Sequence, residues 1–315
     1  MKLVIQIPCL DEADQIRATI AELPRELPGI SRVEYLVVDD GSTDGTATIA
    51  REAGAHHVVR HPVNRGLAAA FQTGMHAALA EGADVIVNTD ADNQYNAADI
   101  AVLIAPIVER RADLVVGIRP IDEIEHFTWL KKKLQKLGSF VVRRMSGTEI
   151  RDVTSGFRAL SREAAISINL TSRYTHTLET LVQAGSKSLR IEQVQVRVNP
   201  KRRESRLFRS TAGYVVDSMS DLFRIYLHYQ GPRFFALLGT ALMVPGILLG
   251  LRYVHFESIG MGGGHVQSLI LAAILIVTGF QSWLMSLFLS AQRSSRILIE
   301  RLLSQAKGRD SNSRP

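Results

Sequence analysis

Short apolar runs alternate with helix-like segments through the first 120 residues, and this alternation constrains the fold more than any other feature of the chain. The apolar runs have the length and composition of buried strands, at Leu3–Ile7, Val33–Val38, His57–Val59, Asp84–Val87 and Asp113–Gly117. Helices are expected between them, at Asp11–Leu23, Thr43–Ala53, Leu67–Ala80 and Ala97–Arg110. Strands that alternate with helices imply right-handed crossovers. The pattern therefore predicts an α/β fold with a mostly parallel sheet flanked by helices.

Polar motifs follow four of the predicted strands at the point where each strand ends. They are Pro8–Glu12, Asp39–Asp44, Asp90–Gln94 and Gly117–Arg119. In a parallel sheet these ends share one edge, and ligands bind beyond it. Turn chemistry alone accounts poorly for four such motifs on one rim, so we expect a ligand site there.

The segment Asn88–Gln94 has the most carboxylate and amide side chains of the four motifs on this rim. Side chains alternate along an extended chain, so Asp90, Asp92 and Gln94 are expected to project together. Two carboxylates and an amide oxygen suit Mg²⁺ or Mn²⁺, which takes its other ligands from substrate phosphates. A solvated Asp-rich turn that caps the next helix is the alternative interpretation.

Beyond residue 120 the regular alternation stops. Phe127–Met145 has the spacing of an amphipathic basic helix, and Thr175–Ala184 that of a helix containing Glu179. Leu189–Val198 alternates like a strand and is followed by the basic segment Lys201–Leu207. Thr211–Tyr229 is rich in apolar and aromatic residues, which fits a helix on a membrane surface or one packed on the globular domain.

Two nearly uncharged runs, Phe234–Leu251 and Ser268–Ala291, are long enough to cross a bilayer. Arginines and lysines flank their outer ends, so both ends are expected to face the cytoplasm. Two buried core helices are the alternative, although such length without charge is unusual in a soluble domain. Met1–Ile7 is too short for the apolar region of a signal peptide, so none is expected.

The composition fits a folded protein, with 46% hydrophobic and 22% charged residues. The net charge of +6 is concentrated in a few clusters. Clustered charge favours local anion sites or a membrane-facing edge over nucleic-acid binding. Cys9 is the one cysteine, which excludes an intrachain disulfide.

Taken in order, the motifs resemble those of family 2 glycosyltransferases with the GT-A fold. The motifs are Pro8–Glu12, Val37–Asp44, Asn64–Gly66 and Asp90–Gln94. Val153–Arg158, Glu179 and Glu204–Leu207 are similar to the branch that transfers a sugar from a nucleotide to a polyprenyl phosphate. The resemblance implies a cytoplasmic catalytic domain, a juxtamembrane helix, two transmembrane helices and a basic tail, over residues 1–209, 210–232, 233–292 and 293–315. It also implies a multi-pass protein of the cytoplasmic (inner) membrane.

The same resemblance implies roles for individual residues. Pro8, Glu12, Asp39, Asp40 and Asp90 would contact the nucleotide sugar, and Arg119 its diphosphate. Asp92, Gln94 and Asp90 would hold the metal, and Asp92, Arg119 and Glu179 would form the catalytic group. A divalent ion and an arginine would offset the charge that builds on the departing diphosphate. Transfer would be a single displacement with inversion.

The motifs contain no histidine or Ser–His arrangement that would serve as a general base. A hydroxyl acceptor needs such a base, whereas a phosphate monoester is already largely anionic at neutral pH because its second pKa is ~6. Arg202, Ser205, Arg206 and Arg143 are candidates for holding the acceptor phosphate. A lipid or glycan hydroxyl acceptor and a non-catalytic scaffold that binds nucleotide sugars are the alternatives. The sugar, the nucleotide and homo-oligomer formation are left open.

Overall fold

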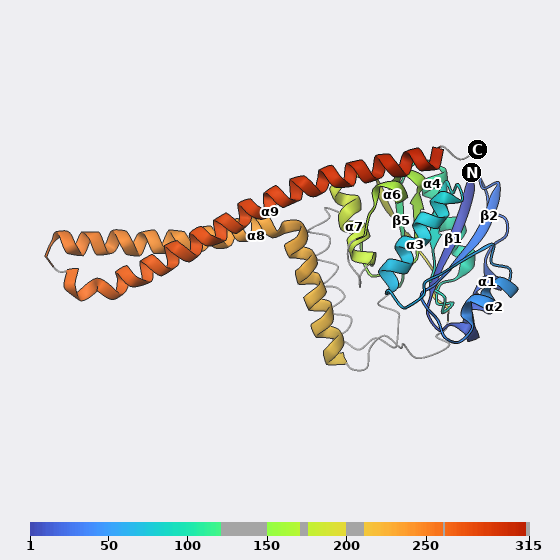
Figure 1. Cartoon of the computed structure of the whole chain (residues 1–315), viewed down its shortest axis with the longest axis horizontal. Helices are drawn as coiled ribbons and strands as arrows, with labels where there is room; N and C mark the ends of the chain where they lie inside the picture. The colour runs from blue at the N-terminus through green and yellow to red at the C-terminus, as the bar shows by residue number, and fades with distance from the viewer. Residues whose placement is uncertain (121–149, 171–175, 200–210, 261, 313–315) are drawn as a thin grey trace. The chain divides into compact units, whose positions relative to one another are not determined.

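The computed structural model describes residues 1–120, 150–170, 176–199, 211–260 and 262–312. The chain forms two compact units, of which Phe223–Leu302 is one and Met1–Leu222 with Leu303–Pro315 the other. The strands of the first unit are β1 (Lys2–Cys9), β2 (Arg32–Asp39), β3 (His57–Arg60), β4 (Val85–Asn88), β5 (Leu114–Ile118), β6 (Arg158–Ser161) and β7 (Ile191–Gln195). Its helices include α1 (Ala13–Glu22), α2 (Thr46–Glu52), α3 (Leu67–Ala80), η1 (Ala97–Asp99), α4 (Ile100–Val108), α6 (Arg162–Ser167) and α7 (His176–Ser186). Figure 1 shows these elements in the blue, green and yellow part of the chain.

The seven strands form one sheet in the order β3-β2-β1-β4-β6-β5-β7. All neighbouring pairs are parallel except those of β6, which runs antiparallel to both β4 and β5. The parallel strands therefore end on one edge of the sheet, and β6 begins on that same edge. The predicted mostly parallel sheet is confirmed.

The register of β1 sets the geometry of this edge. Its last residue, Cys9, pairs with Asp39 at the end of β2, and Gln6 pairs with Asn88 at the end of β4. The first two polar motifs thus leave the sheet side by side, and the Asp motif follows directly after β4. Apolar burial on both faces of β1 explains why its sequence is nearly continuously hydrophobic.

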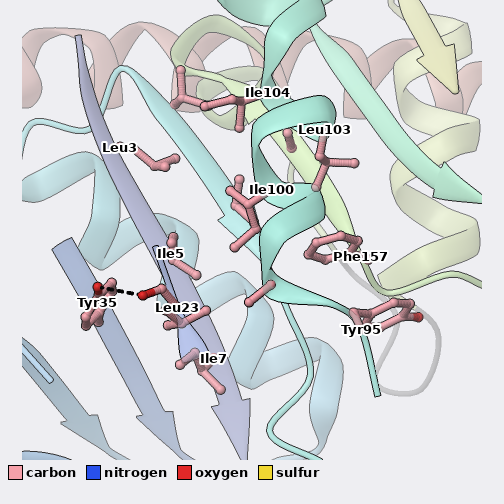
Figure 2. Close-up of a cluster of buried hydrophobic side chains, with 14 of the residues drawn as sticks. Leu3, Ile5, Ile7, Leu23, Tyr35, Tyr95, Ile100, Leu103, Ile104 and Phe157 are labelled. Atoms are coloured by element: carbon pink, nitrogen blue, oxygen red, sulfur yellow. Dashed lines mark hydrogen bonds between the residues drawn. The ribbon is translucent and has the colours of Figure 1, made fainter. Parts of the chain in front are cut away.

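A hydrophobic cluster fills the space between the sheet and the helices on one face. Leu3, Ile5 and Ile7 of β1 lie in this cluster with Ile100 and Leu103 of α4. Figure 2 shows the β1 side chains directed toward α4, with Tyr35 hydrogen-bonded to the carbonyl of Leu23. Because strand residues alternate in direction, Val4 and Gln6 face the opposite side, where α3 packs.

Some elements differ from the sequence-based expectations. Asp152–Arg158 was expected as a loop or short strand, and it is a loop that leads into the antiparallel β6. The strand expected over Leu189–Val198 ends at Gln195, because Val198 instead forms an isolated bridge with Tyr95. The helix expected over Phe127–Met145 and the basic segment Lys201–Leu207 lie outside the described residues.

Two long apolar helices dominate the second unit. They belong to α8 (Thr211–Ser258) and α9 (Val266–Asn312), with the short η3 (Gly262–His265) between them. Gln230–Ser258 and Val266–Gln292 are long and apolar enough to cross a membrane. Residues of both the expected juxtamembrane helix and the expected basic tail are helical, as parts of α8 and α9.

Close approach of the two helices depends on glycines. A Cβ on Gly239 would lie 2.7 Å from the Gly279 carbonyl oxygen and 2.2 Å from Cδ1 of Trp283. The indole N–H of Trp283 donates to Thr240 at 3.2 Å, and the Ser286 hydroxyl donates to the Pro232 carbonyl at 2.7 Å. Small residues and interhelical hydrogen bonds are the usual means by which apolar helices associate in lipid.

Gly239→Ala should therefore weaken the helix pair by about 1–3 kcal/mol, since the added methyl has no room. The matched control is Gly250→Ala, where the new Cβ would meet only Ala272 Cβ at an ordinary 4.0 Å. The measurement is unfolding of the detergent-solubilised protein followed by helical circular dichroism. Equal midpoints for the two variants would show that this contact does not stabilise the pair.

Candidate active site

The Asp motif forms a turn at the carboxyl end of β4. Asp90, Asp92 and Gln94 are half-buried, while Ala91, Asn93 and Tyr95 between them are buried. These three polar side chains are thus more exposed than their neighbours. The segment is a turn and not the extended chain on which the expectation rested, so their joint projection stays a prediction. Asn93 adopts a left-handed backbone with φ of 55°, a conformation that asparagine tolerates better than most residues. Oδ1 of Asp92 accepts the Gln94 N–H at 3.1 Å, which orients this carboxylate.

Residues after β7 hold the turn from behind. The Asn199 side chain donates to the Asn93 carbonyl at 3.0 Å, and the Asn199 N–H donates to the Gln94 carbonyl at 2.8 Å. Tyr95 stacks on Phe157 with ring centroids 4.8 Å apart, a pair visible in Figure 2. The backbone of the turn is therefore tied to two other segments of the fold.

Asp90 is the most strongly perturbed carboxyl of the site. Its side chain keeps some exposed surface, yet burial is the main factor that raises its pKa to about 7. The Asp92 carboxylate raises this pKa further and Arg119 opposes the rise, while Glu12 adds a smaller contribution. Asp92, Arg119 and Glu12 therefore all lie close enough to act on Asp90, which gathers three of the motifs into one electrostatic site.

Arg119 follows β5 and is held by Asp152. Its Nε and one terminal nitrogen donate to the two Asp152 oxygens at 2.7 and 3.1 Å, and the same terminal nitrogen donates to the Thr154 hydroxyl at 3.1 Å. Asp152 is fully buried. Burial alone would raise the pKa of Asp152, but the hydrogen bonds and charge of Arg119 outweigh burial and hold this pKa below its usual value. The guanidinium is thus a fixed positive charge beside the Asp motif.

The loop that carries Asp152 also touches Asp90 directly. A Cβ on Gly156 would lie 3.0 and 3.3 Å from the two Asp90 oxygens. The Gly156 N–H donates to the Tyr95 hydroxyl at 3.1 Å. A glycine is needed here because its backbone lies against the carboxylate. The loop 152–157 therefore contacts both the cationic and the anionic side of the site.

The first two rim motifs interlock where β1 and β2 end. The Glu12 N–H donates to the Thr46 hydroxyl at 2.9 Å, and the Asp39 carboxylate accepts the Ser42 N–H at 2.8 Å. Nε of Arg60, at the end of β3, lies 3.3 Å from the second Asp39 oxygen. Pro8 lies within β1 and pairs with Val38 of β2. Pro8, Glu12 and Asp39 thus lie together at the ends of β1 and β2, where all three are buried, and their contact with a nucleotide stays a prediction.

Asp40 has a different environment from its neighbour. Its carboxylate accepts the backbone N–H groups of Arg65 and Gly66 at 2.9 and 2.8 Å, and Oδ1 lies 2.6 Å from Nδ1 of His61. His61 contacts the Thr73 hydroxyl through its other ring nitrogen at 3.0 Å. Asp40 thus holds the loop before α3, and its direct contact with a nucleotide stays a prediction.

The remaining predicted site residues divide into two groups. Glu179 lies on α7, is 2% exposed, and accepts the side-chain amide of Gln183 at 3.2 Å. Its catalytic role stays a prediction. The four residues proposed for the acceptor phosphate lie outside the described residues, namely Arg143, Arg202, Ser205 and Arg206.

The donor set fits a hard divalent cation. Burial and the neighbouring Asp92 carboxylate both raise the pKa of Asp90, and a bound cation would offset the repulsion between the two carboxylates. Within the described part of the chain, no group of three or more His, Cys, Asp and Glu side chains is arranged to hold a metal. Asp92, Gln94 and Asp90 would supply only part of a coordination shell, as is usual for Mg²⁺ at phosphate sites.

The chain belongs to glycosyl transferase family 2, whose family model matches residues 4–168. Its fold is that of the GT-A enzymes. Glucosyl-3-phosphoglycerate synthase from Mycobacterium tuberculosis, solved with Mn²⁺, UDP and glucosyl-3-phosphoglycerate, superposes with a TM-score of 0.54 at 21% identity. The match covers 73% of this chain and 78% of that one. The protein is therefore a glycosyltransferase.

Two relatives identify lipid-phosphate acceptors within the family. An undecaprenyl-phosphate mannosyltransferase of Micrococcus luteus is 31% identical over 54% of this chain and 70% of its own length. A UDP-N-acetylglucosamine–dolichyl-phosphate N-acetylglucosaminyltransferase of Methanococcus voltae is 31% identical over 61% of this chain and 83% of its own length. The predicted resemblance to the polyprenyl-phosphate branch is thus confirmed at the level of homology.

Several residues of this site have no role in the sequence-based predictions. Asp152, Thr154 and Gly156 were part of a quoted motif or its edge but received no role. Asn199 and Tyr95 were not considered as supports of the turn. The sequence did hold a signal for Asp152, which directly precedes the motif Val153–Arg158. A carboxylate in that position is a natural partner for Arg119, the arginine expected to bind the diphosphate.

Asp90→Asn should stabilise the metal-free protein in a pH-dependent way. The folded protein keeps a proton on Asp90 up to about pH 7, while the usual value is 3.8. Native Asp90 therefore costs stability as pH rises through this window, and the amide abolishes that cost. We expect a gain of up to about 4 kcal/mol at pH 8, at about 1.36 kcal/mol for each pKa unit, and almost none at pH 4.

The measurement is chemical unfolding with a chelator present. Asp14→Asn, on an exposed side chain of α1, controls for the loss of one carboxylate. A gain that is the same at both pH values would contradict the raised pKa.

Asp152→Asn should destabilise the fold by about 2–4 kcal/mol, because it leaves the Arg119 guanidinium without its buried counter-charge. Adding Arg119→Met removes that guanidinium, so the double variant should lose less stability than the sum of the two single variants. Urea unfolding measures all three. Strictly additive losses would show that the pair does not act as a unit.

Proposed function

We propose that this protein transfers one sugar from a UDP- or GDP-sugar to a polyprenyl phosphate at the cytoplasmic face of a membrane. The observation that carries the proposal is the presence, in one chain, of the Asp90–Asp92 site and two helices of membrane-spanning length. A lipid-borne acceptor explains why a family 2 catalytic domain carries such helices. The names of the two relatives with lipid-phosphate acceptors support it.

The chemistry of the acceptor agrees with the side chains of the rim. A phosphate monoester is already a nucleophilic anion at neutral pH, so it requires positioning by cations more than deprotonation. His61 is 4% exposed and both of its ring nitrogens contact protein groups, so an acceptor on the rim has no access to it as a general base. The basic residues expected to bind the acceptor are Arg143, Arg202 and Arg206, with Ser205 beside them.

The donor would lie along the rim. Pro8, Glu12 and Asp39 would contact its nucleoside, and Asp40 would act through the loop that it holds. Asp92, Gln94 and Asp90 would hold Mg²⁺ or Mn²⁺, which supplies positive charge to the leaving diphosphate when bound. Arg119, oriented by Asp152 and Thr154, would contact the same diphosphate. Attack from the opposite side of the sugar gives inversion.

Two competing functions make different predictions. A glycosyltransferase that uses a lipid or glycan hydroxyl would give a product that survives mild acid, whereas sugar–phosphate linkages to polyprenols are acid-labile. A non-catalytic scaffold would bind nucleotide sugars without consuming them. The rim with paired carboxylates and an oriented arginine favours catalysis over binding alone.

The test is incubation of the purified protein with a panel of UDP- and GDP-sugars, undecaprenyl phosphate and Mn²⁺, with mass spectrometry of the lipid fraction. We expect one acid-labile glycosyl phospholipid. Asp92→Ala should reduce its formation at least ~100-fold, because the metal loses a ligand. The exposed Asp14→Ala should retain activity.

Each adverse result has a distinct meaning. An acid-stable product would replace the phosphate acceptor by a hydroxyl. Unaltered turnover by Asp92→Ala, with circular dichroism equal to that of wild type, would reject the metal assignment. Absence of donor consumption with every sugar would favour the scaffold.

A further inference from the structure

Arg158 is a buried arginine that the reaction described above does not use. It is the first residue of β6 and is fully buried. Its guanidinium donates to three backbone carbonyls, those of Ser155, Val153 and Thr177, at 2.8, 2.8 and 2.6 Å. Burying a guanidinium is costly, and these three hydrogen bonds offset part of that cost.

Arg158 belongs to a row of polar side chains that crosses the sheet. The register pairs Gln6 of β1 with Asn88 of β4, and Asn88 with Arg158 of β6. The amide of Gln6 donates to the Asn88 side chain at 3.0 Å, and Asn88 donates to the Gly156 carbonyl at 2.8 Å. All three side chains are fully buried. The row therefore ends on the loop 152–157.

The loop depends on these side chains for its backbone hydrogen bonds. Arg158 donates to the carbonyls of Val153 and Ser155, and Asn88 donates to the carbonyl of Gly156. The Gly156 N–H donates to the Tyr95 hydroxyl. A buried backbone needs such partners when no strand supplies them. The conformation of the loop is thus set by side chains of the sheet, and by Arg158 more than by any other described residue.

Three residues with predicted roles, namely Arg119, Asp90 and Glu179, are connected to this loop. Asp152 and Thr154 orient Arg119. Gly156 lies against the Asp90 carboxylate. Thr177, in the first turn of α7, precedes Glu179 by two positions. Arg158 therefore connects the loop that orients the arginine to the helix that carries Glu179.

We propose that Arg158 is a positioning residue of the transfer reaction, which fixes the loop 152–157 so that Arg119 meets the donor diphosphate. The proposal rests on the proposed function in one respect, the contact between Arg119 and the diphosphate. Lysine cannot replace Arg158, because one nitrogen cannot reach three carbonyls that a planar guanidinium spans.

The experiment compares Arg158→Lys with Arg162→Lys in the full-length protein. Arg162 begins α6 and donates to one carbonyl, that of Ala83, at 2.9 Å, so it is a matched arginine away from the loop. The readout is calorimetric affinity for Mn²⁺ with UDP or GDP, whichever binds the wild type more tightly. We expect a ~10- to 100-fold loss for Arg158→Lys and a change of less than ~3-fold for Arg162→Lys.

A double-mutant cycle separates positioning from general structure. If Arg158 acts through Arg119, then Arg158→Lys should add little to the loss caused by Arg119→Ala. Independent losses that multiply, or full affinity in Arg158→Lys with only a lower unfolding temperature, would overturn the proposal. Transfer to polyprenyl phosphate is assayed separately on the wild type. If the protein does not use that acceptor, the double-mutant cycle still tests the role of Arg158, because it measures nucleotide binding alone.

Two further measurements test the proposal if Arg158→Lys does not fold, or without any bound ligand. Asn88→Ala removes one loop contact and replaces Arg158→Lys if that variant does not fold, with the same non-additive result expected. Hydrogen exchange of the segment 152–160, without ligand, should accelerate in both variants while β1 remains protected. Unchanged exchange in this segment would also overturn the proposal.

Discussion

Parallel pairing of β1 with β2 and β4 is the constraint on which the rest of this structure depends. Once Cys9 lies opposite Asp39 and Gln6 opposite Asn88, the polar residues that follow each strand must emerge on one edge. The sheet itself is buried on both faces, so this edge is where polar side chains can gather with access to solvent. The location of the site follows from the register.

The antiparallel strand β6 brings a further segment to the same edge of the sheet. Because β6 runs opposite to its neighbours, its beginning lies at the edge where the others end. The loop before it therefore enters the rim, with Asp152 and Gly156 on it. Parallel strands alone would build the site only from the residues that follow each strand. The reversed β6 adds the residues that precede a strand.

The electrostatics of the rim combine two opposite arrangements. Arg119 is matched to a buried carboxylate, and that pairing holds the guanidinium in one orientation. Asp90 and Asp92 repel each other, and burial makes ionisation of Asp90 harder still. A divalent cation added to such a site would relieve the repulsion between the two carboxylates.

Much of this protein could be predicted from local patterns. Strand and helix positions such as β1 and α3 follow from hydrophobic period, and the two membrane-length helices follow from length and lack of charge, both of which are properties of contiguous residues. The alternation of the half-buried Asp90, Asp92 and Gln94 with buried neighbours is likewise a property of contiguous residues. The family could be recognised because its motifs occur in order.

Only the tertiary structure decided which partner each polar side chain has. Asp40 engages His61 across 21 positions, Arg119 engages Asp152 across 33, and Asn88 reaches Gly156 across 68. No local pattern encodes such pairs, because they arise when strands distant in sequence are brought into register. The sequence alone thus determined which elements form and which residues carry charge. The packed sheet decided which carboxylates are held by other side chains and which remain at the rim for a ligand, since burial and distance exist only once the chain has folded.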